Sequence, residues 1–274
     1  MRKILVLALF LGAALPAAAL PPGIASATID GNTVSLTVAL PGGLGADVTL
    51  GFESVSGLSL ANLGISASVV NLFDPVFLSR IPSGSVLALP LVLHVDPPAA
   101  GGLSFRGIAG LSIHTENLSY TIGTPLRLFG AHPGESFKDI TNGVGAGSYR
   151  ARSSTGGFSD FIIVVDLRSL SQVLRNKLDR LDDELDEYAG SMPAAVHNAL
   201  AARLAAARLD VTLGNKAAAI QEIDGFLAIV QQHAGVDIPD VWRAARDVDN
   251  VAGYLREDAL TLRFSLGLSG FLWL

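Results

Sequence analysis

The sequence predicts an α+β protein in which an antiparallel β-sandwich, immunoglobulin-like or jelly-roll-like, precedes a small antiparallel four-helix bundle. Hydrophobic residues alternate with polar ones up to about residue 166, and after residue 167 they recur every three or four positions. Residues 20–166 hold 21 of the 29 glycines but only 16 charged residues, whereas 167–274 hold 26 charged residues. We therefore expect a leader (1–19), a sandwich domain (20–166), a helical domain (167–259) and an apolar tail (260–274).

Residues 1–19 have the three-part pattern of a secretory signal peptide. Two basic residues precede the uncharged apolar run 4–15, and the small residues Ala17 and Ala19 predict cleavage after Ala19. An anchoring transmembrane helix is the alternative, but the run is shorter than the roughly 20 residues that span a bilayer. No Cys precedes the cleavage site, which excludes a lipoprotein anchor. We expect a periplasmic or extracellular protein of a Gram-negative bacterium, with no stable membrane insertion after signal removal.

The composition narrows the class of partner. Without the leader the chain has 17 basic and 25 acidic residues, a net charge of −8, which repels phosphate backbones and argues against nucleic-acid binding. The absence of Cys excludes disulfides, thiolate nucleophiles and cysteine metal sites. A secreted animal protein of this size usually has disulfides, so bacterial export is the better interpretation.

Alternation with a period of two predicts the strands of the first half. Asp30-Gly31-Asn32 is a turn before the first long run, Pro90 indicates an edge strand or a bulge, and 153–157 is expected to be a hairpin loop. The expected strands lie within residues 33–40, 48–52, 87–95, 111–113, 118–122, 126–128, 148–152 and 161–165.

A helical period predicts four helices in the second half. The first, 170–188, places leucines in one stripe, the second ends at Leu213, and the third ends at Gly235. The fourth is expected to start at Asp237 or Asp240 and to carry Trp242 on its apolar side. The tail alternates again from Leu260 to Leu266. It could add a strand to the sandwich, pack against the bundle or dock on a partner.

Part of the helical half resembles a known module. Residues 204–209 (Leu-Ala-Ala-Ala-Arg-Leu), the stretch from Leu213-Gly214-Asn215 to Ile220, and Phe226, Leu227 and Val230 are similar to FIMAH-type helical modules of bacterial extracellular proteins. The resemblance covers roughly a hundred residues. It implies a non-catalytic, extracellular accessory unit. In that family a large enzyme or adhesin usually precedes the module, and this sequence shows neither.

Three residues are weak metal-ligand candidates. His94, His114 and Glu116 are two imidazoles and a carboxylate, a ligand set that suits iron or zinc when it converges. Convergence requires adjacent strands and a shared pocket. Their strand phase instead points them towards solvent, so we expect no metal and no other cofactor.

Other motifs of catalysis are weak. The sequence has no Gly-x-Ser-x-Gly nucleophile elbow, and Gly143, Gly145 and Gly147 lead into a strand rather than a helix, which argues against a phosphate loop. The acidic run 179–187 follows a leucine stripe, so we expect a solvated helix face paired with basic residues of the same helix. Asp139 and Asp160 are expected to form cross-strand ion pairs with the arginines of a neighbouring strand, Arg150 and Arg152.

These observations favour a non-catalytic secreted or envelope protein that acts through protein contacts, as a scaffold or adhesion-type module. A carbohydrate-binding accessory protein is the first alternative, although exposed aromatic platforms are scarce in the sandwich. A hydrolase with a dispersed carboxylate site is the second. An aromatic-lined groove would favour carbohydrate binding, and a buried carboxylate pair with raised pKa values would favour hydrolysis.

Overall fold

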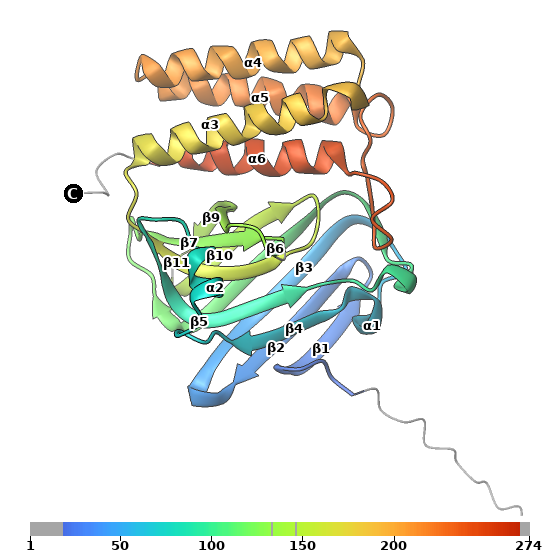
Figure 1. Ribbon diagram of the computed structural model, residues 1–274, viewed down its shortest axis with the longest axis vertical. Coiled ribbons are helices and arrows are strands. Elements are labelled where there is room, and N and C mark those ends of the chain that lie inside the picture. The colour runs from blue at the N-terminus through green and yellow to red at the C-terminus, as the bar shows by residue number, and fades with distance from the viewer. Residues whose placement is uncertain (1–18, 133, 146, 269–274) are drawn as a thin grey trace, which may run out of the picture.

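The computed structural model describes residues 19–132, 134–145 and 147–268 and shows a mixed α+β architecture (Figure 1). Two antiparallel sheets lie below a layer of helices. Residues 1–18 of the predicted leader, Ala17 among them, lie outside the described residues, which begin at Ala19. Among the helices of the described part, none is both long and apolar enough to cross a membrane.

The elements alternate more than the sequence pattern predicts. The strands are β1 (Ile24–Asp30), β2 (Thr33–Leu40), β3 (Leu44–Ser56), β4 (Ile65–Val69), β5 (Ser85–Val95), β6 (Ser104–Ser119), β7 (Leu126–Ala131), β8 (Lys138–Asp139), β9 (Thr141–Gly145), β10 (Ser148–Thr155), β11 (Asp160–Asp166) and β12 (Val241–Arg243). The α-helices are α1 (Leu60–Leu63), α2 (Pro75–Ser79), α3 (Leu170–Glu187), α4 (Ala194–Thr212), α5 (Lys216–His233) and α6 (Val251–Leu266). Three 3₁₀ turns are η1 (Pro41–Gly43), η2 (Ala99–Gly101) and η3 (Ala189–Ser191). A strict order of strands before helices is therefore not observed.

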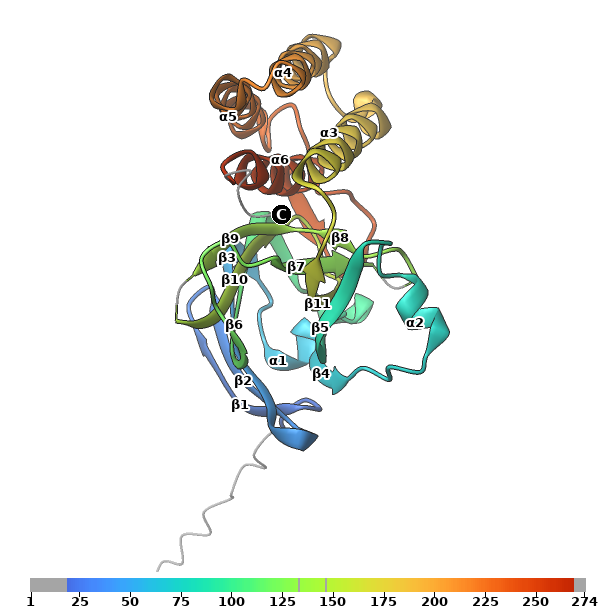
Figure 2. The ribbon, with the colours of Figure 1, turned by 90° about the vertical axis from the view of Figure 1, so that its left-hand side faces the viewer.

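The two sheets share one apolar core. Within the described residues the larger sheet has the order β1-β2-β3-β6-β10-β9, with β12 also paired to β6, and the smaller sheet has the order β4-β5-β11-β7-β8. Figure 2 shows the larger sheet on the left and the smaller on the right. Val34 and Leu50 of the larger sheet belong to the same buried cluster as Leu93 and Phe161 of the smaller one. Each such side chain contributes about 1.5–3 kcal/mol through burial.

The outer face of the smaller sheet is also covered. Val92, Phe129 and Ile162 point to this side and pack with Phe77 of α2 and with Phe137 in a second apolar cluster. β11 is therefore buried on both faces, which explains its continuous apolar run Phe-Ile-Ile-Val-Val.

The helices α3 to α6 bury a third apolar cluster between them. The predicted leucine stripe of α3 is buried, from Leu170 to Leu185. α6 also lies directly against β9 and β10, so this helix joins the helical layer to the larger sheet (Figure 1).

The predicted fourth helix is wrong at its start. Residues 241–243 form β12, which pairs with β6 through Trp242 and Phe105, and the helix begins only at Val251 after its N-cap Asn250. Trp242 is 5% exposed and stacks on Phe105 at 5.4 Å between ring centroids, with Phe158 edge-on at 4.9 Å. This aromatic burial outweighs the helical spacing of the segment.

Three further predictions are corrected or resolved. The tail is not a strand between Leu260 and Leu266, because these residues continue α6, and 269–274 lie outside the described residues. Residues 153–157 do not close a hairpin, since β10 and β11 belong to different sheets. Pro90 lies in an inner strand, and the register of β5 against β11 shifts beside it, so the bulge rather than the edge is correct.

Candidate functional site

His94 lies at the centre of a polar line across three strands of the smaller sheet. Its Nδ1 is 2.7 Å from Oδ1 of Asp160 on β11, and its Nε2 is 3.2 Å from Oγ of Ser68 on β4. The register accounts for this, because Asp160 is directly opposite His94. Asp160 also accepts a hydrogen bond from Nη1 of Arg80 at 3.0 Å. It therefore pairs with Arg80 and His94, not with an arginine of a neighbouring strand as predicted.

This line has the atom order of a hydrolytic Ser–His–Asp triad. The carboxylate of Asp160 favours a proton on Nδ1 of His94, which leaves Nε2 to accept the hydroxyl of Ser68. Burial alone would raise the pKa of Asp160. The hydrogen bonds from His94 and Arg80 outweigh burial and hold that pKa below its usual range. Asp160 therefore stays ionised at neutral pH.

Two backbone N–H groups beside Ser68 are engaged in hydrogen bonds. A serine hydrolase needs free N–H groups near the nucleophile to stabilise the oxyanion. The N–H of Ala67 donates to the carbonyl of Pro22, and the N–H of Val70 donates to the carbonyl of Pro90, both at 2.9 Å. These two donors are therefore not free, and the polar line joins three strands and the α2 segment.

His114 lies in a second polar line, on the larger sheet. Its Nε2 is 2.5 Å from Oγ of Ser148, and its Nδ1 is 3.6 Å from Oδ2 of Asp47, which is too long for a hydrogen bond. Glu116 and His114 line the same small hollow of about 300 Å³, together with Thr37 and Asp47. Asp47 accepts a hydrogen bond from Thr37 at 3.3 Å.

The three metal-ligand candidates do not converge. His94 belongs to the smaller sheet, whereas His114 and Glu116 belong to the larger one. Across the described ranges, no three His, Asp or Glu residues are grouped so that they could hold a metal ion.

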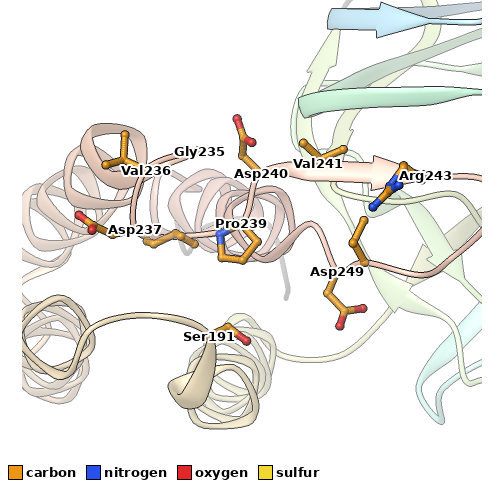
Figure 3. Close-up of a pocket in the computed structure, with 11 residues that line it drawn as sticks. Ser191, Gly235, Val236, Asp237, Pro239, Asp240, Val241, Arg243 and Asp249 are labelled. Carbon is orange, nitrogen blue, oxygen red and sulfur yellow. The ribbon is translucent and has the colours of Figure 1, made fainter.

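A larger hollow lies where the helical layer meets the larger sheet. It has a volume of about 570 Å³ and opens to solvent between the α5–β12 loop, the η3 turn and the segment before α6 (Figure 3). Apolar side chains form much of its wall, and Ser191 of η3 faces the loop from the opposite side. Its lining residues are Ser191, Gly235, Val236, Asp237, Ile238, Pro239, Asp240, Val241, Arg243, Val248 and Asp249. We refer to it as the acid-rimmed hollow.

Backbone contacts fix the loop that forms this hollow. The carbonyl of Asp240 accepts the N–H of Gly107 at 2.9 Å, and the carbonyl of Pro239 accepts the N–H of Ala252 at 2.8 Å. Gly235 adopts a φ of +72°, and a Cβ there would lie 2.9 Å from the Asp240 carboxylate. Only glycine fits this position without strain. The hollow is thus tied to both β6 and α6.

The charges at the rim are mostly negative. Asp237 pairs with Nδ1 of His233 at 2.6 Å, and Asp240 is 4.0 Å from Nε of Arg106. Asp249 is exposed and forms no ion pair with any residue that the structure describes. Arg243, the cation in the lining, pairs with Asp247 at 3.3 Å.

The sequence did not reveal this hollow. The sequence pattern predicts a helix cap at Asp237 or Asp240, and no feature singles out Val236 or Asp249. The sequence feature that could have indicated it is Gly235 with Ile238-Pro239-Asp240. These residues are typical of a turn, and the Val241-Trp242 pair that follows them is typical of a strand.

A group of buried charges joins the helices to the sheets. Arg180 of α3 donates to Asp258 of α6 at 2.7 Å, and Lys138 of β8 lies 3.3 Å from Glu257 and 3.7 Å from Asp258. Burial is the main cause that raises the pKa of Glu184 to about 7, with Asp258 adding repulsion and Lys138 opposing it. The acidic face of α3 is therefore partly buried, not fully solvated as predicted.

Comparisons with known proteins give a family but no activity. No curated protein matches the chain. It has a weak similarity to a solved structure, that of CBM51-2 in complex with GlcNAc and INT domains from Clostridium perfringens ZmpB, with 8% identity and a TM-score of 0.19. The alignment covers 76% of this chain and 54% of that one, and a likeness this weak bears on neither fold nor function. A family model described as a family of unknown function, DUF6689, matches residues 6–269, so the chain belongs to that family.

Proposed function

We propose that this protein is a non-catalytic bacterial protein, exported to the periplasm or the cell exterior, that acts through protein contacts at the acid-rimmed hollow. The signal-peptide pattern of residues 1–19 supports the location. We further propose that residues 20–166 are a β-sandwich and that α3 to α6 are an antiparallel four-helix bundle. The apolar core that the two sheets share supports the first proposal, and the apolar cluster that α3 to α6 bury between them supports the second.

The observation that carries the contact function is the exposure of Val236 at the lip of the hollow. This side chain is 82% exposed although the loop that bears it is tied to β6 and α6. A volume of about 570 Å³ lies within the usual range of ligand sites, roughly 300–1,000 Å³. An apolar hollow with a fixed wall suits association, because little conformational entropy is lost on binding.

Two features of the site argue against the alternatives. A sugar platform needs an exposed aromatic face, but the residues that line the hollow include no aromatic one, and the neighbouring Trp242 is buried between Phe105 and Phe158. A hydrolase needs both carboxylates of its pair to reach a substrate, and Asp258, the carboxylate whose charge raises the pKa of Glu184, is only 1% exposed and is held ionised by Arg180 and Lys138.

Site-specific photo-crosslinking tests the proposal. Val236 is replaced by p-benzoylphenylalanine, and so, in a matched control, is Leu213, which is 63% exposed at the end of α4. Cells expressing each form are irradiated, and adducts from envelope and medium fractions are identified by mass spectrometry. We expect a recurrent protein adduct at position 236 that is absent at position 213. Identical adduct patterns at the two positions would overturn the proposal.

A further inference from the structure

The walls of the acid-rimmed hollow select one kind of side chain. Ile238, Pro239, Val241 and Val248 line it, and Val236 extends its apolar surface towards solvent. These are aliphatic groups without an aromatic face, so they pack best against branched aliphatic side chains.

The backbone N–H groups of residues 235–238 are not free to pair with an added strand. The N–H groups of Val236, Asp237 and Ile238 all donate to the carbonyl of His233, at 2.9–3.1 Å. The N–H of Gly235 donates to the carbonyl of Ile238 at 2.8 Å. Because these donors are engaged, recognition at this lip depends on side chains.

Charge selects the second property of the ligand. The rim has three carboxylates, Asp237, Asp240 and Asp249, and the lining cation Arg243 is already paired with Asp247. Asp240 has only a distant cation at 4.0 Å, and Asp249 has no ion pair with a described residue. A neutral or anionic ligand would leave these charges uncompensated, whereas a cationic ligand would complement them.

The negative charge of Asp249 also affects the pKa values of two tyrosines near it. Burial is the largest cause that raises the pKa of both Tyr188 and Tyr254, and the negative charge of Asp249 contributes at each. These two rings stack at 6.1 Å between centroids, at the junction of α3 and α6. An uncompensated negative charge therefore lies beside the hollow.

From these features we infer that the acid-rimmed hollow binds a peptide segment that combines lysine or arginine side chains with a branched aliphatic side chain. The aliphatic group occupies the apolar wall, and the cations lie against Asp240 and Asp249. This inference names the partner class of the proposed protein contact and so depends on that function.

Fluorescence anisotropy with defined peptides tests this partner class. The probe is fluorescein-labelled Lys-Leu-Lys-Leu-Lys, added to the exported form that begins at residue 20. Lys-Ser-Lys-Ser-Lys and Glu-Leu-Glu-Leu-Glu are the matched probes, one without apolar groups and one with reversed charge. We expect only the first to bind, and to bind more weakly at about 0.5 M than at about 0.05 M NaCl because rim charges are screened.

Paired variants separate the hollow from the net charge of the chain. Asp249→Asn and Val236→Ser should each raise the Kd of the first probe about fivefold or more. Asp183→Asn removes an equal charge from an exposed position of α3, and Leu213→Ser removes an apolar side chain that is also exposed. Neither control residue lines the hollow, so neither control should change the Kd. Circular dichroism should show all four variants folded.

The outcomes also distinguish this inference from the proposed function. Equal weakening by Asp249→Asn and Asp183→Asn would show general attraction to an acidic protein and would overturn the inference. Equal binding of Lys-Ser-Lys-Ser-Lys, or no binding of the first probe, would do the same. If position 236 still gave a specific cross-link, the contact function would stand and only the cationic preference would fail. Loss of both would refute both.

Discussion

The ammonium of Lys177 lies 2.7 Å from Oδ2 of Asp139, and each side chain is only 2% exposed. Nζ also donates to Oγ1 of Thr261 at 2.6 Å and to Oγ of Ser265 at 2.9 Å. The pair thus connects α3 with α6 and with β8 of the smaller sheet. Burial lowers the pKa of Lys177 to about 8 despite Asp139. Burial also opposes ionisation of Asp139, but Lys177 and Arg127 outweigh it and lower the pKa of Asp139.

We expect Lys177→Met to destabilise the fold by about 3–5 kcal/mol, because it removes the ammonium that lies 2.7 Å from the buried carboxylate of Asp139. Urea unfolding at pH 7 measures this. Adding Asp139→Asn should recover most of the loss, since the amide removes the buried negative charge that Lys177 had balanced. Arg175→Met, on the exposed face of the same helix, should change the unfolding free energy by less than about 0.5 kcal/mol. A double variant as unstable as the single one would contradict this account.

Glu184 should make stability fall as pH rises from about 4.5 to about 7. Its pKa is 4.5 in the unfolded chain and about 7 in the fold, chiefly because of burial. In this window the folded state binds more protons than the unfolded state, so the unfolding free energy decreases with pH. Glu184→Gln should therefore raise the melting temperature relative to wild type at pH 8 and change it little at pH 4.5. Asp183→Asn, whose carboxylate is exposed, should show no such pH dependence. An equal effect of Glu184→Gln at both pH values would refute the prediction.

The hydrophobic periodicity of the sequence was sufficient to predict those elements in which buried residues recur with the same period. Val34, Leu36 and Val38 alternate in β2 because one side of this strand faces the core, and the leucine stripe of α3 is buried along its length. Such elements are predictable because each residue's environment depends on its neighbours in sequence.

Long-range contacts decide the rest of the fold and the site. The spacing from Trp242 to Leu255 is compatible with a helix. However, β12 pairs with β6, where Val241 lies opposite Arg106, 135 residues earlier in the chain, and this pairing imposes an extended chain. His94 and Asp160 meet only because β5 and β11 are neighbours. The acid-rimmed hollow joins Ser191 to residues 235–249. None of these proximities has a signature in a short window of sequence, so composition and period could not reveal them.

Trp242 should be a principal contributor to stability outside the helical core. Trp242→Ala removes an indole buried against Phe105 and Phe158 and is expected to cost about 3–5 kcal/mol. Denaturant unfolding followed by far-ultraviolet circular dichroism measures the loss. Phe73→Ala is the aromatic control, because Phe73 is 92% exposed, and should have an effect below about 0.5 kcal/mol. Similar losses in the two variants would show that the aromatic cluster does not stabilise β12.

The last prediction concerns the link between β3 and α6. Arg256 donates hydrogen bonds to both carboxylate oxygens of Glu53, at 2.6 and 2.8 Å. These hydrogen bonds and the charge of Arg256 outweigh the effect of burial and lower the pKa of Glu53. Gly107 has a φ of +71°, and a Cβ on it would lie within 1.8 Å of Oε2 of Glu53.

Gly107→Ala should therefore lower the unfolding free energy by more than backbone strain alone would. Gly102 supplies the control, because its φ is +72° and a Cβ there meets nothing within 4 Å. Gly102→Ala should cost about 1–2 kcal/mol, the penalty of a left-handed residue with a side chain. Gly107→Ala adds displacement of Glu53 from Arg256, so its loss of unfolding free energy should be larger. The excess should shrink in a Glu53→Ala background, where the added methyl no longer meets a carboxylate. If both glycine variants lose the same amount in the wild-type background, the contact with Glu53 has no energetic role.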